Sequence, residues 1–135
     1  MKFTDNMAET VAALKRSTHA RVVMLGSEPV WRRGLPNEVL KYYLLRHRLI
    51  PVRASGDIMP NVYDAELRRK LAKFISGWDV FCNGDGCLAR LGDEVSDIST
   101  SDVIHLTEKG SIFLIQAIID QVLKGEAAPV TNISQ

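Results

Sequence analysis

The feature that most constrains the fold is an alternation of amphipathic helical stretches with short apolar runs. Residues 5–17 have Met7, Val11 and Leu14 at helical spacing, which predicts an amphipathic helix. Arg21–Leu25 is a short β-branched and apolar run that ends at Gly26, as is typical of a buried parallel strand. The chain therefore begins with a helix followed by a strand.

The same alternation continues to the last quarter of the chain. Pro36 suits the first turn of a second helix, whose inner face is predicted to hold Val39, Leu40, Tyr43 and Leu44. Beyond a loop over residues 51–60, the sequence predicts a third helix, a second strand and a final helix. These are Asp64–Ser76, with Leu67, Leu71, Phe74 and Ile75 at helical spacing, then Trp78–Cys82, and then Glu108–Lys124.

This order predicts an α/β fold with a parallel sheet joined by crossover helices. Residues 1–125 form the predicted domain, residues 83–101 are mostly loop, and residues 126–135 form a loose tail. Two strands alone leave sheet edges unpaired. We therefore expect an exposed apolar flank that is met by another segment or by self-association through the sheet edge.

Composition excludes some classes of protein. The 135 residues are 46% hydrophobic and 24% charged, as in ordinary globular domains, and the net charge of +1 gives no reason to expect nucleic acid as a partner. No apolar run reaches the about 18 residues of a transmembrane helix, and the chain does not begin with a signal peptide. Translated as written, it would stay in the cytoplasm.

The candidate site is the pair Asp102 and His105, which precedes the last predicted helix. Thr107 is the expected N-cap of that helix. A carboxylate can fix the tautomer of an imidazole and stabilise its protonated form, which lets the histidine act as a general base. The sequence has no Gly-x-Ser-x-Gly turn to present a nucleophile. The pair is therefore half of a triad.

These residues resemble the last block of the SGNH (GDSL-like) hydrolases, in particular SGNH domains linked to membrane acyltransferases that modify bacterial surface glycans. The pattern Asp-x-x-His-Leu-Ser/Thr-x-x-Gly is matched by Asp102, His105, Leu106, Thr107 and Gly110. Two further stretches agree with the family, namely Val22–Pro29 and the cysteine pair Cys82 and Cys87. The resemblance covers about residues 7–123.

The resemblance implies a flavodoxin-like three-layer α/β/α fold that lacks its N-terminal strands here. It implies an acyl esterase or O-acyltransferase that uses an acyl donor and a glycan acceptor without a cofactor. Asp102 and His105 would be the triad acid and base, and Gly26, Ser27 and Pro29 would border the cleft. The family's Gly-Asp-Ser block, oxyanion-hole glycine and Gly-x-Asn-Asp asparagine have no counterpart, so the chain alone is expected to be inactive. As part of a longer membrane protein, it would lie in the periplasm.

Cys82 and Cys87 bracket Asn-Gly-Asp-Gly, a turn-rich tetrapeptide that could bring the two sulfurs together. Two reduced thiols are the alternative, while the resemblance implies a disulfide and hence an oxidising compartment. Two cysteines are too few for a structural zinc site, and His19 and His47 lack ligand spacing, so no metal is expected.

Two other functions remain open. The chain could be a non-catalytic remnant or interaction module, because the nucleophile block is absent. A nucleotide-binding α/β domain is the other alternative, although neither predicted strand is followed by Gly-x-Gly-x-x-Gly or a phosphate loop. If the isolated chain had activity, Ser27, Ser55 and Ser101 would be the first nucleophiles to test.

Overall fold

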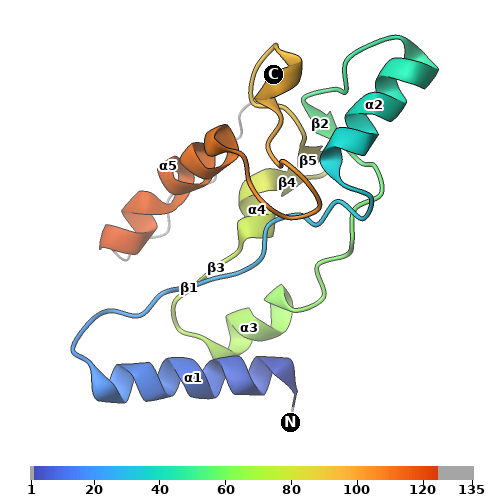
Figure 1. Cartoon of the computed structure of the whole chain (residues 1–135). Coiled ribbons are helices and arrows are strands. Elements are labelled where there is room, and N and C mark those ends of the chain that lie inside the picture. The colour runs from blue at the N-terminus through green and yellow to red at the C-terminus, as the bar shows by residue number, and fades with distance from the viewer. Residues whose placement is uncertain (1, 125–135) are drawn as a thin grey trace.

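The computed structural model describes residues 2–124. Figure 1 shows the arrangement of its elements. The helices are α1 (Phe3–Ser17), α2 (Leu35–Arg46), α3 (Asp64–Lys70), α4 (Gly77–Phe81) and α5 (Glu108–Lys124), with a short 3-10 helix η1 (Val95–Asp97). The strands are β1 (Met24–Leu25), β2 (Arg53–Ala54), β3 (Phe74–Ile75), β4 (Cys82–Asn83) and β5 (Gly86–Leu88).

The parallel sheet consists of β1 and β3. Met24 pairs with Phe74 and Leu25 pairs with Ile75, and the chain between these strands passes through α2, β2 and α3. A parallel pair joined by a helical crossover is the arrangement that the sequence predicts. The α/β fold class is therefore confirmed.

A second sheet was not predicted. Strands β2, β5 and β4 form an antiparallel sheet in that order, and β4 and β5 are consecutive strands of a hairpin in which Asn83 pairs with Gly86. Residues 83–101 were predicted to be mostly loop, and strands of only two and three residues leave little pattern in the sequence. The fold is therefore a mixed α/β fold rather than a purely parallel one.

Two predicted elements near the middle of the chain were wrong. The third helix ends at Lys70 rather than Ser76, since Phe74 and Ile75 leave the helical path to pair with β1. The predicted strand Trp78–Cys82 is instead mostly helix α4. Ser76 caps this helix, because its hydroxyl accepts a hydrogen bond from the backbone N–H of Asp79 at 3.1 Å.

The inner face of α2 was also predicted wrongly. Leu40, Tyr43 and Leu44 are exposed, while Leu35 is buried and Val39 packs only partly into the core. Leu35 packs into the cluster around Trp31, with Val39 one turn later against the same cluster, and the backbone N–H of Leu35 donates to the carbonyl of Asp102 at 3.0 Å. The side of α2 that contains Leu35 and Val39 therefore faces inward. A hydrophobic pattern along one helix contains no information about such a contact.

Three apolar clusters hold the elements together. One gathers around Trp31 and Leu35 beneath α2 and contacts the β2–β5–β4 sheet. The second lies between α4 and α5. The third joins α1 to α3, which lie side by side at one end of the molecule, away from α2 (Figure 1). The Asp102–His105 loop lies close to the first two clusters, where α2 and α5 begin.

Within residues 2–124, none of the helices has the length and apolar character needed to cross a membrane. The same residues contain no group of three or more His, Cys, Asp or Glu side chains that could hold a metal ion. The predicted end of the last helix at Gly125 and the predicted tail over 126–135 lie outside the described residues.

Candidate active site

The loop that carries Asp102 and His105 is closed by its own backbone and docked onto α2. Ser101 donates its N–H to the carbonyl of His105 at 2.8 Å, and Thr100 forms a bridge with Leu106. The carbonyl of Asp102 accepts the Leu35 N–H of α2, which would otherwise lack a partner at a helix N-terminus. The first turn of α2 therefore fixes the position of the Asp102 backbone.

The turn Trp31–Gly34 completes this attachment. Trp31 donates its N–H to the carbonyl of Val103 at 2.9 Å, and Gly34 donates to the carbonyl of Trp31 at 2.8 Å. Gly34 has a φ of 83°, a conformation that side chains disfavour. This turn was not predicted, and the signal for it in the sequence is Gly34 directly before the first residues of α2, Leu35 and Pro36.

Both oxygens of Asp102 are used within the loop. Oδ1 accepts hydrogen bonds from the backbone N–H groups of Ile104 and His105, each at 2.8 Å. Oδ2 lies 2.7 Å from Nδ1 of His105. A carboxylate accepts from Nδ1–H, which leaves Nε2 as the unprotonated nitrogen of the neutral ring. The geometry therefore aims a basic Nε2 away from Asp102, as a general base requires.

The same contacts keep Asp102 ionised. The backbone N–H of His105, the His105 ring and the N–H of Ile104 lower the pKa of the Asp102 carboxyl from 3.8 to about 2. The Asp102 side chain is 50% exposed and the His105 side chain is 74% exposed. Water weakens electrostatic stabilisation at such a surface. A catalytic role for this pair requires that something else cover it.

The residues after the pair each have a structural role at the start of α5. The Thr107 hydroxyl accepts the Gly110 N–H at 3.0 Å, which confirms Thr107 as the N-cap. It also donates to the carbonyl of Ile98 at 2.7 Å, tying the helix start to the preceding segment. Leu106 packs against the apolar cluster between α4 and α5. These contacts fix where the loop ends and the helix begins.

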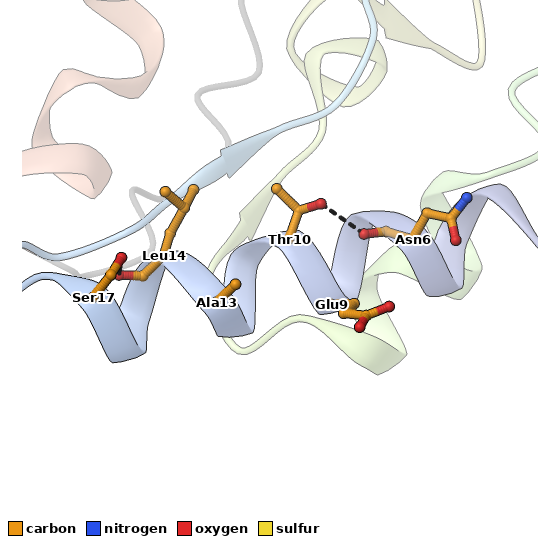
Figure 2. A pocket seen from close by; sticks show the side chains of 6 residues that line it. All are labelled: Asn6, Glu9, Thr10, Ala13, Leu14 and Ser17. Carbon is orange, nitrogen blue, oxygen red and sulfur yellow. Dashed lines mark hydrogen bonds between the residues drawn. The ribbon is translucent and has the colours of Figure 1, made fainter.

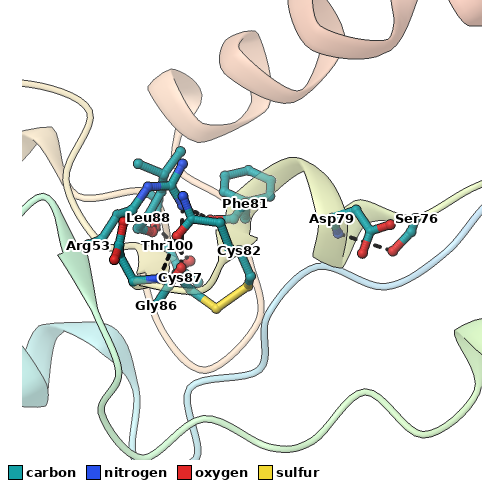
Figure 3. The surroundings of a disulfide bond; sticks show 12 residues. Arg53, Ser76, Asp79, Phe81, Cys82, Gly86, Cys87, Leu88 and Thr100 are labelled. Carbon is teal, nitrogen blue, oxygen red and sulfur yellow. Dashed lines mark hydrogen bonds between the residues drawn. A yellow bond between two sulfur atoms is a disulfide. The ribbon is translucent and has the colours of Figure 1, made fainter. Parts of the chain in front are cut away.

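The predicted disulfide between Cys82 and Cys87 is present. It closes the β4–β5 hairpin, in which the two cysteines pair directly across the strands. Figure 3 shows Arg53 beside it, where the guanidinium donates to the carbonyls of Phe81 at 2.9 Å and Gly86 at 3.3 Å. The disulfide and Arg53 together fix the hairpin against β2.

The predicted cleft residues lie at the carboxyl end of β1. Gly26 is buried and donates its N–H to the carbonyl of Ile75 at 2.7 Å. Pro29 is also buried, and Ser27 is exposed. Residues 30–35 connect this stretch to the Asp102 loop. The cleft-lining role of Gly26, Ser27 and Pro29 stays a prediction.

Within residues 2–124, no serine hydroxyl forms a hydrogen bond with the ring of His105. The Ser101 hydroxyl contacts His105, but it donates to the backbone carbonyl at 3.1 Å rather than to the imidazole. Ser55 lines a separate cavity. Within residues 2–124, the pair therefore has an acid and a base without a nucleophile in contact.

Two surface hollows lie away from the pair. The first is formed by one side of α1 alone (Figure 2), so a single helix supplies every residue that lines it. The second is a cavity of about 430 Å³ between Gly56, Trp78 and the disulfide hairpin. Neither is lined by Asp102 or His105. Both side chains of the pair are open to solvent.

Neither a family model nor a curated protein matches the chain. Among solved structures, it is similar to the periplasmic domain of a lipopolysaccharide acetyltransferase from Salmonella ser. Paratyphi A, with a TM-score of 0.79 and 23% sequence identity. The match covers 88% of this chain and 48% of that domain. The chain therefore has the fold of about half of that acetyltransferase domain.

Proposed function

We propose that this chain supplies the acid and base of a Ser-His-Asp triad to an SGNH-type domain that transfers or hydrolyses acyl groups on hydroxyls of cell-surface glycans. The serine would come from a segment outside residues 1–135. The observation that carries the proposal is the contact of 2.7 Å between Asp102 Oδ2 and His105 Nδ1, with Nε2 left free to accept a proton.

The reaction assigns one role to each residue. Nε2 of His105 would take the proton of the serine hydroxyl as its oxygen attacks the acyl carbonyl, and Asp102 would stabilise the imidazolium that forms. His105 would return the proton to the leaving group. Water, giving an esterase, or a sugar hydroxyl, giving a transferase, would then attack the acyl-serine, and His105 would pass the attacker's proton to the departing serine oxygen. The low pKa of Asp102 keeps it charged throughout this cycle.

The solved lipopolysaccharide acetyltransferase domain supports the substrate class. Its fold is shared over 88% of this chain, and that protein is an acetyltransferase of lipopolysaccharide, a surface glycan. The Cys82–Cys87 disulfide supports an oxidising location such as the periplasm. Both observations agree with an extracytoplasmic domain that modifies glycans.

The test replaces His105 in the native gene and measures ester-linked acyl groups on the purified surface polysaccharide by proton NMR, before and after mild alkaline treatment. His105→Ala should reduce the alkali-labile signal to background, because a general base contributes about 10²–10⁴-fold in rate. His19→Ala is the matched control, since His19 is also exposed but forms no ion pair with a carboxylate within residues 2–124. Acylation that is equal in both variants would refute the proposal.

The alternative is a non-catalytic interaction module. This alternative is favoured for the isolated chain because, within residues 2–124, no serine hydroxyl is hydrogen-bonded to the His105 ring. Purified residues 1–135 should show no hydrolysis of an activated acetyl ester that depends on His105. A rate that disappears in His105→Ala would instead place the nucleophile within the chain.

A further inference from the structure

Helix α5 has a second apolar face that the described residues leave uncovered. Ile112, Ile115, Ile119 and Leu123 recur at intervals of three or four residues and are 49%, 52%, 38% and 65% exposed. This spacing places them in one stripe along the helix. We call these four residues the α5 stripe.

The inner face of the same helix is already buried. Leu114 and Ile118 are each 4% exposed and pack against the cluster that contains Ile75 and Phe81. A helix that is apolar on more than one side is typical of a position between two packed layers. Asp120 and Lys124 of α5 pair with each other, and helical spacing places both off the stripe. α5 therefore resembles a helix that is packed on two sides, but within the described residues only its inner side is covered.

The comparison with the solved domain indicates what the other layer is. This chain matches 48% of that domain, so a protein with the complete fold has about as much polypeptide again to pack against it. We propose that the α5 stripe is the docking surface for the complementary part of an acyltransferase domain, an α/β segment with an apolar face. This inference rests on the proposed function, because the same segment would bring the nucleophile.

The position of the stripe fits that partner. α5 begins three residues after His105, so a segment that packs on Ile112 and Ile115 lies beside the loop that carries the pair. Such a segment could cover the exposed side chains of Asp102 and His105 and exclude water from them. Docking and completion of the site would then be one event.

Single cysteines provide the test, since the two native cysteines form a disulfide and do not compete for a maleimide reagent. Ile115→Cys places the thiol on the stripe. Asp120→Cys is the matched control on the same helix, off the stripe, where the side chain is 64% exposed. Labelling rates are compared between the purified 135-residue chain and the folded native gene product.

We expect both thiols to react at similar rates in the purified chain. In the native product, Ile115→Cys should react at least about tenfold more slowly than Asp120→Cys. Equal rates in the native product would overturn the inference. Protection that grows with the concentration of the purified chain would identify a second copy as the occupant and would also overturn it.

Two further comparisons complete the test. The Ile115→Cys thiol could be protected in the purified chain and lose that protection when the chain is shortened to residues 1–124. This result would mean that residues 125–135 cover the stripe, and it would overturn the inference. Adding His105→Ala to the native product should leave the protection unchanged, since docking does not need catalysis. Protection combined with normal glycan acylation in His105→Ala would refute the proposed chemistry and retain the docking surface.

Discussion

The backbone of Gly110 lies directly against the carbonyl oxygen of Ser99, such that a Cβ atom on Gly110 would clash with that oxygen. Both partners are backbone groups in fixed elements, because Gly110 belongs to the first turn of α5 and the Ser99 carbonyl also faces the Thr107 N–H at 3.0 Å. Neither can move without displacing the start of α5. Packing against Ser99 therefore explains why the last position of the pattern Asp-x-x-His-Leu-Ser/Thr-x-x-Gly is a glycine here.

Gly110→Ala should consequently destabilise the fold, although alanine favours helices. Overpacking costs about 1–3 kcal/mol. The clash here is with a backbone carbonyl, which cannot turn aside like a flexible side chain, so the cost should exceed the helix-propensity gain of about 1 kcal/mol. Urea unfolding measures the difference. Gly84→Ala is the control, because a Cβ atom at Gly84 meets no atom within 4 Å. Equal stability of the Gly110→Ala variant and the unmodified protein would contradict this packing.

The contact between Asp102 and His105 predicts the tautomer of the imidazole. In the neutral ring, ¹⁵N NMR should show the proton on Nδ1 and none on Nε2, since Asp102 Oδ2 accepts from Nδ1. Asp102→Ala should lose this preference. A ring that carries its proton on Nε2 in the unmodified protein would rule out the proposed base.

Asp102 should also contribute stability that depends on pH. Its pKa in the folded state, about 2, lies below the ordinary value of 3.8 that applies when the chain is unfolded. The unfolded state therefore binds more protons in this interval, so the contribution is fully present above pH 3.8 and is lost as the pH falls from 3.8 to about 2.

The measurement compares the free energy of unfolding of the unmodified protein with that of Asp102→Asn across this interval. The advantage of the unmodified protein should shrink as the pH falls. Asp5, Glu66 and Asp97 also have lowered pKa values, but they are present in both proteins and their effects cancel in the difference. An advantage that does not change with pH would contradict the assigned hydrogen bonds.

The disulfide should stabilise the fold modestly. It closes a short loop, because its cysteines are five residues apart, and the chain-entropy model gives about 2 kcal/mol for a loop of this size. The double variant Cys82→Ser, Cys87→Ser should lose about that amount in thermal or urea unfolding. Adding a reductant should destabilise the unmodified protein and leave the double variant unchanged. A reductant effect of equal size on both would refute this assignment.

The sequence predicted the elements with strong periodicity and missed those determined by tertiary contacts. α1 and α5 were predicted nearly to their ends because their apolar spacing is long and regular. The helix predicted over Asp64–Ser76 was too long because Phe74 and Ile75 suit a helix and a strand equally, and pairing with β1 decided between them. Ser76 followed by Asp79 was an available signal for α4 that a short apolar run obscured.

In the candidate site, too, local contacts could be predicted from the sequence and contacts between distant segments could not. Asp102, His105 and Thr107 were found because their contacts are local, within a few residues of sequence. The attachment of this loop to Trp31 and Leu35 joins segments about 70 residues apart, and no pattern in one sequence indicates it. The orientation of α2 follows from that attachment, which is why its inner face was predicted wrongly.

The most direct test of the central claim is labelling of the native gene product by a fluorophosphonate, which reacts with serines activated by a histidine base. The proposed triad predicts labelling of one serine outside residues 1–135, lost in His105→Ala and retained in His19→Ala. Labelling that is unaffected by His105→Ala, or a native product that does not react at all, would contradict the claim that Asp102 and His105 belong to a triad.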